Sequence, residues 1–132
     1  MIGRTRRVAV ALALAVALEA SSAAGAGGVK LDAEQAATAE LIRSVWPDAH
    51  EGDAVRVAWC ESELRPWIVS PRNRNGTRDH GVFQLNDGGT MQGLGLTAAE
   101  ALEPEANVRA ALRLWRARRW RPWSCRRVLG RR

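Results

Sequence analysis

The sequence has few of the residues that hold a metal ion or a cofactor. Its 132 residues include only two histidines, His50 and His80, which stand alone, and two cysteines. The histidines are isolated and no cysteine is spare once the two pair with each other, so no ligand set is left for a structural zinc site. The chain also has no glycine-rich phosphate loop, and neither histidine has a recognisable partner that would make it the base for a serine nucleophile. We therefore expect no metal and no cofactor.

Long apolar runs are missing as well. The longest covers residues 8–18, which is too short to cross a bilayer as a helix. Three arginines precede it and the small residues Ala24-Gly25-Ala26 follow, a pattern typical of a secretory signal peptide; a membrane anchor is the alternative. We predict a signal peptide over residues 1–26 and one domain over residues 27–132. The mature chain is then an exported monomer of the cell wall or periplasm, without a membrane span.

The two cysteines, Cys60 and Cys125, form the smallest set that can make a disulfide. In an exported protein such a pair is expected to be joined, with two free thiols as the alternative. Closing a loop of this length stabilises a fold by roughly 4 kcal/mol in the chain-entropy model.

Acidic residues are absent after Glu105, whereas ten arginines lie between Arg109 and Arg132. A basic C-terminal region suits an anionic surface such as a wall polymer or a nucleic acid. The alternative is a solvated helix face in an arginine-rich proteome, which the single lysine, Lys30, supports. We expect anionic wall polymers as possible partners, and no nucleic acid.

Local patterns predict helices on both sides of a small hairpin, hence a mainly α (α+β) fold. Caps and apolar spacing predict three helices and a short fourth. The hairpin is expected to pair residues 67–69 with residues 82–85 around an Asn75-Gly76 turn. The helices are expected from an Asp32–Gln35 capping pair to Val45, from an Asp53 cap through Glu61, from a Thr97–Glu100 pair through Leu102, and from Pro104 with an apolar stripe of Val108, Ala111, Leu112 and Trp115.

Glu61 is the residue best placed for chemistry. It follows Ala54, Val57 and Ala58 by seven, four and three positions, so a helix puts all four on one face. Loss of hydration on an apolar face and the negative end of the helix dipole both disfavour the ionised carboxylate. A carboxylic acid that keeps its proton near neutral pH can act as a general acid. Asp79 follows as a second carboxyl, and glycoside hydrolysis uses two carboxyls in different environments.

The order of these residues resembles the animal-type lysozymes and the lytic transglycosylases of the lysozyme-like superfamily. The resemblance rests on Glu61-Ser62, on the segment Asp79-x-Gly81-Val82-Phe83-Gln84-Leu85-Asn86, and on the closing Trp120-x-x-Trp123-x-Cys125. It implies that Glu61 is the general acid and Asp79 the second carboxylate. It also implies that Gln84, Asn86, Trp120 and Trp123 line a sugar-binding cleft. Asp79 could instead cap a turn, and Glu63 and Asp87 are rival carboxylates.

The implied activity is cleavage of the β-1,4 bond between N-acetylmuramic acid (MurNAc) and N-acetylglucosamine (GlcNAc) in peptidoglycan glycan strands. Hydrolysis and transglycosylation both remain open. Asp79 favours hydrolysis, whereas a chain with only one possible disulfide looks more like a bacterial transglycosylase. A non-catalytic wall-binding module and a cationic exported protein that binds polyanions are the alternatives from other classes.

Overall fold

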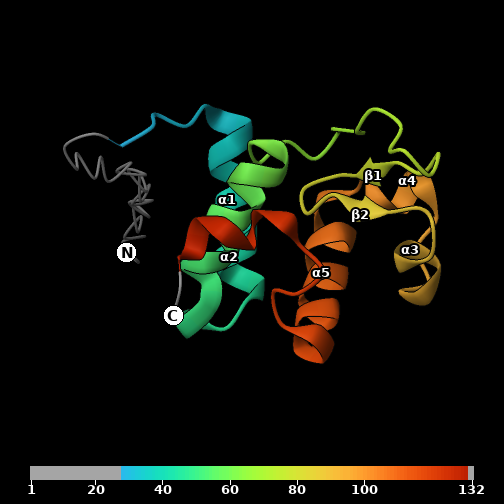
Figure 1. Ribbon diagram of the computed structural model, residues 1–132. Helices are drawn as coiled ribbons and strands as arrows, with labels where there is room; N and C mark the ends of the chain where they lie inside the picture. The colour runs from blue at the N-terminus through green and yellow to red at the C-terminus, as the bar shows by residue number, and fades with distance from the viewer. Residues whose placement is uncertain (1–27, 131–132) are drawn as a thin grey trace, which may run out of the picture.

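The chain folds into helices with a very small antiparallel sheet beside the short helices α3 (Thr90–Gly93) and α4 (Ala98–Ala101) (Figure 1), which confirms the predicted mainly α (α+β) class. The computed structural model describes residues 28–130, so the predicted signal peptide over residues 1–26 lies outside the described residues (Figure 1). Among the described residues, no helix is long and apolar enough to cross a membrane. In chain order the elements are α1 (Ala33–Val45), α2 (Asp48–Ser62), β1 (Asp79–His80), β2 (Leu85–Asn86), α3 (Thr90–Gly93), α4 (Ala98–Ala101), α5 (Pro104–Arg118) and the 3₁₀ helix η1 (Ser124–Leu129).

The helix boundaries follow from short-range capping. Asp32 and Gln35 form the predicted capping box before α1, and Thr97 and Glu100 form the second one before α4. The helix that carries Glu61 was predicted too short, because α2 begins at Asp48 and not after a cap at Asp53. Asp48 and Glu51 occupy its first turn, where negative charge complements the helix dipole, so the helix continues through Gly52.

The predicted hairpin is wrong in its strands, whereas its predicted turn at Asn75-Gly76 does form, between the bridged residues Val69 and His80. β1 pairs with β2 through Asp79 opposite Asn86 and His80 opposite Leu85, and residues 81–84 form the turn between them. The segment 67–69 contributes one bridge, Val69 to His80. Asn75-Gly76 does make a turn, in which the Gly76 amide donates to the Asn73 carbonyl, but this turn lies within the loop before β1.

Aromatic rings make up much of the core. Trp46 stacks on Phe83 and on Trp120, with ring centroids 5.5 and 5.3 Å apart. Trp115 and Trp123 extend this group from α5 and from the start of η1. The predicted apolar stripe of α5 is buried, which brings this helix against α1.

The disulfide between Cys60 and Cys125 is confirmed and spans 65 positions. It joins the last turn of α2 to η1. Figure 1 shows η1, drawn in red, lying across the green ribbon of α2. A second link comes from Arg56, whose guanidinium donates to the Val128 carbonyl. The C-terminal segment is thereby attached to the helix that carries Glu61.

Candidate active site

Glu61 lies in the last turn of α2, half-buried, immediately before the helix ends. The backbone reverses there, because Glu63 and Leu64 both adopt the left-handed conformation, with φ of 53° and 61°. Burial raises the pKa of the Glu61 carboxyl, and the negative charge of Asp79 raises it further. A hydrogen bond from the Cys125 amide, at 3.3 Å to Oε1, and the charge of Arg127 act in the opposite direction on this pKa. Burial is the largest of these causes, so the pKa is raised overall, as an acid catalyst requires.

The turn formed by residues 81–84 is tied to three separate helices. The Ser62 hydroxyl on α2 donates to the Val82 carbonyl at 2.7 Å. Asn107 on α5 is completely buried and accepts from the Phe83 amide at 2.9 Å. The Trp123 indole, at the start of η1, donates to the Phe83 carbonyl at 2.9 Å. These bonds fix the β1–β2 hairpin relative to Glu61.

Gly81 lets this turn approach α4 and α5 closely. Its φ is +75°, and a Cβ atom at this position would lie 2.2 Å from the Ala101 carbonyl and 2.4 Å from Nδ2 of Asn107. These two atoms are hydrogen-bonded to each other, because Asn107 Nδ2 donates to the Ala101 carbonyl at 2.8 Å. A side chain at this position would therefore displace the hairpin.

Asp79 lies on β1 with its carboxylate held by two amides. Asn86 Nδ2 donates to Oδ1 at 2.8 Å, and Asn73 Nδ2 donates to Oδ2 at 3.1 Å. The Ser70 hydroxyl is 3.5 Å from Oδ2 but only 2.8 Å from the Pro71 carbonyl, so its hydrogen is directed to that carbonyl. The negative charge of Asp79 also lies close enough to Glu61 to raise the pKa of that carboxyl.

The two rival carboxylates are placed differently. Glu63 is exposed at the left-handed end of α2. The Asp87 carboxylate accepts a hydrogen bond from the Arg78 amide at 2.9 Å and so helps to fix the loop before β1. No described contact brings either one to Asp79.

The expected sugar-binding residues divide between two places. Gln84, Asn86 and Trp123 line a small hollow with Asp79, of about 80 Å³. Trp120 lines a different groove, beside Arg126 and Arg127. The Gln84 amide donates both to the Ile68 carbonyl and to the Gly81 carbonyl, and Asn86 bridges Asp79 to Thr77, so both side chains also hold the hairpin together.

Glu61 itself lines a groove of about 320 Å³ that the sequence did not reveal. Its other lining residues are Cys60, Ser62, Glu63, Arg65, Trp67 and Ile68. The sequence predicts a strand at Trp67 and indicates no role for Arg65. The sequence offered one signal for this groove: both residues follow Glu61 closely in the chain, just after the end of a helix. Within residues 28–130, no group of three or more histidine, cysteine or carboxylate side chains is arranged to hold a metal ion.

Comparison with known proteins identifies the family of this chain. No curated protein matches the chain. A family model described as a lysozyme-like domain matches residues 49–125, from the second residue of α2 to the cysteine that η1 contributes to the disulfide. The match therefore includes Glu61, Asp79, the hairpin and the residues that anchor it, and it covers more than half of the chain. On this ground the chain belongs to the family of lysozyme-like domains.

Proposed function

We propose that this protein cleaves the glycan strand of peptidoglycan at the β-1,4 bond between MurNAc and GlcNAc, with Glu61 as the general acid. The lysozyme-like family connects the chain with peptidoglycan-related glycosidases and transglycosylases. The single observation that carries the proposal is the half-buried Glu61 carboxyl at the end of α2, whose pKa burial raises. An acid that retains its proton at neutral pH can donate it to a glycosidic oxygen.

In the first step, Glu61 gives its proton to the oxygen that bridges the two sugars. The bond from that oxygen to C1 of MurNAc breaks, and GlcNAc leaves with a new hydroxyl group. Positive charge develops on the MurNAc ring, and a negative carboxylate beside that ring stabilises the transition state. Asp79 is suited to this role because two amide donors hold its carboxylate in place, near enough to Glu61 for its charge to raise the pKa of that carboxyl.

The second step has two possible nucleophiles. In hydrolysis, water attacks C1 of MurNAc, the Glu61 carboxylate accepts a proton from this water, and a reducing end forms. In transglycosylation, the 6-hydroxyl of the same MurNAc attacks C1, the Glu61 carboxylate accepts its proton, and a 1,6-anhydro ring forms. The first step is common to both, so only the products distinguish them.

Mass spectrometry of digested, purified peptidoglycan tests the proposal. We expect soluble fragments from the wild-type protein and none from Glu61→Gln, because the amide keeps the size of the side chain and lacks the acidic proton. Glu40→Gln is the matched control, since it removes an exposed carboxyl on α1 that does not line the groove around Glu61. Activity of Glu61→Gln within about tenfold of wild type, with an unchanged circular dichroism spectrum, would contradict the assignment.

A second role is favoured by the groove beside η1. Arg126, Arg127 and Trp120 line this groove of about 560 Å³, together with Asp53. We propose that it binds anionic wall polymers, which would keep the protein near its substrate. Binding of Glu61→Gln to intact walls should weaken steeply with salt, and Arg126→Gln should reduce that salt dependence; equal binding at low and high salt would contradict this role.

Export of the protein would place it in the compartment where peptidoglycan lies. We propose that residues 1–26 are removed on export and that residues 27–132 act as a monomer outside the cytoplasm. The disulfide agrees with an oxidising compartment. The intact mass of the exported protein tests the cleavage site, and a retained leader would contradict it. Elution on size exclusion tests whether the protein is a monomer.

A further inference from the structure

All six tryptophans lie within residues 28–130, and Trp67 is the one among them that lies largely in solvent. Its exposed fraction is 59%, whereas the other five are buried or packed against the core. Trp67 lines the same groove as Glu61. A large aromatic side chain left exposed beside a candidate acid catalyst favours binding of a ligand that covers the ring.

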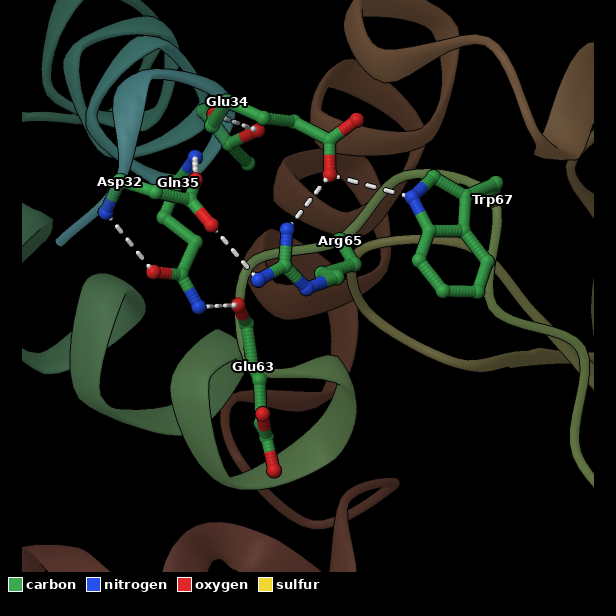
Figure 2. A network of polar contacts seen from close by, with 7 residues as sticks. Asp32, Glu34, Gln35, Glu63, Arg65 and Trp67 are labelled. Atoms are coloured by element: carbon green, nitrogen blue, oxygen red, sulfur yellow. Dashed lines mark hydrogen bonds and ion pairs between the residues drawn. The ribbon is translucent and has the colours of Figure 1, made fainter.

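A network of polar contacts fixes the orientation of this indole, as Figure 2 shows. The Trp67 Nε1–H donates to Glu34 Oε1 at 3.0 Å. The same oxygen accepts from Arg65 Nη1 at 2.9 Å, and Arg65 Nη2 donates to Asp32, the N-cap of α1, at 2.7 Å. The N–H edge of the indole is thus attached to α1 through this network. A ring that is already oriented loses little conformational freedom when a ligand stacks on it.

The charges beside the groove select an uncharged ligand. Arg65 is the basic residue among the lining residues, and its guanidinium is already paired with Asp32 and Glu34. These three groups together carry a net negative charge, and the exposed Glu63 adds another. A carboxylate, such as one on a peptide stem, would be repelled here, whereas a neutral sugar ring would not.

We propose that Trp67 is a stacking platform for the GlcNAc ring that leaves when the bond is cleaved. This inference rests on the proposed function. Asp79 lines a hollow that shares no residue with the Glu61 groove, so the sugar that becomes positively charged belongs on the side of Asp79. The departing sugar then lies on the other side of the Glu61 proton. In the proposed bond that sugar is GlcNAc, which is neutral and carries no peptide.

Steady-state kinetics on soluble, peptide-free glycan strands test the platform. Trp67→Ala should raise KM by about tenfold with a smaller change in kcat, because stacking is lost equally from the ground state and the transition state. Trp67→Phe should keep KM within about threefold of wild type, since a ring remains. Val69→Ala is the matched control, because it removes exposed apolar surface from the same segment. The thermal midpoint of Trp67→Ala should stay close to wild type, as the ring is exposed.

An unchanged KM in Trp67→Ala, or equal losses in Trp67→Ala and Val69→Ala, would overturn the platform while Glu61-dependent cleavage stands. If the wild-type protein cleaves no glycan, the proposed function fails, and binding then decides about Trp67 alone. In that case peptide-free strands should bind the Glu61→Gln protein about tenfold more tightly than the Glu61→Gln/Trp67→Ala protein. Equal affinities of these two proteins would overturn the platform independently of catalysis.

Discussion

Replacement of Asn107 by leucine should destabilise the fold more than most single changes. Asn107 is completely buried in α5. Its side chain accepts from the Phe83 amide at 2.9 Å and donates to the carbonyls of His80 and Ala101 at 2.9 and 2.8 Å. Leucine has a similar size but can make none of these bonds, so the change tests hydrogen bonding rather than volume.

The magnitude follows from the groups that lose their partner. One buried amide and two buried carbonyls would be left unsatisfied, at about 1–2 kcal/mol each, so the free energy of unfolding should fall by roughly 3–6 kcal/mol. A domain of this size has about 5–15 kcal/mol in total, so the variant should lose a large part of its stability. Ser62→Ala, which removes only the bond to the Val82 carbonyl, should cost about 1–2 kcal/mol.

Urea unfolding followed by far-ultraviolet circular dichroism measures these losses. Asn107→Asp serves as a second variant, because it keeps an acceptor for the Phe83 amide but directs oxygen atoms at the other two carbonyls. Burial would raise the pKa of this new carboxyl, so the folded state would bind its proton more tightly than the unfolded state. Stability of Asn107→Asp should then rise as the pH falls through that pKa. A loss below about 1 kcal/mol in Asn107→Leu would refute the role of Asn107 in holding the turn.

Three further predictions concern the site and its support. Because burial raises the pKa of Glu61, the folded protein binds this proton more tightly than the unfolded chain, and stability falls as pH rises from the ordinary value of 4.5 through the folded-state pKa. Glu61→Gln should therefore be more stable than wild type at pH values above that window and should lose this advantage below pH 4.5, as thermal melts at both pH values would show. Asp79→Asn should lower glycan turnover by about 100-fold if its charge stabilises the developing positive centre; near-wild-type rates, with anhydro products, would make it a turn residue and favour transglycosylation. Gly81→Ala should destabilise strongly, since its Cβ would lie 2.2 Å from the Ala101 carbonyl, whereas Gly93→Ala meets nothing within 4 Å and should be tolerated in the same unfolding assay.

The helices were predictable where their signals are local. Asp32 with Gln35 and Thr97 with Glu100 each form a capping box within four residues of chain, so the sequence alone displays both partners. The stripe of α5 was visible for the same reason, because its apolar residues recur at the spacing of one helix face. Glu61 could be placed at a helix end by this argument, even though the predicted cap at Asp53 lies six residues after Pro47, the N-cap of α2.

The hairpin could not be predicted from local signals, because its turn is decided by residues far away in the chain. Val82 and Phe83 look like strand residues, yet they form the turn because Ser62, Asn107 and Trp123 supply its hydrogen bonds. The groove beside Glu61 was missed for a similar reason. Trp67 became recognisable only through its bond to Glu34, 33 positions earlier.

The aromatic core also has a consequence for spectroscopy. The chain has no tyrosine and a single phenylalanine, so its near-ultraviolet optical activity comes almost entirely from tryptophan. Trp46, Trp115, Trp120 and Trp123 form one cluster, with ring centroids 5.3 to 6.1 Å apart, and fixed neighbouring indoles give strong signals of this kind. Loss of these bands with the helical spectrum retained would identify a state whose side chains no longer pack. The intact molecule thus contains its own reporter of core order, without any label.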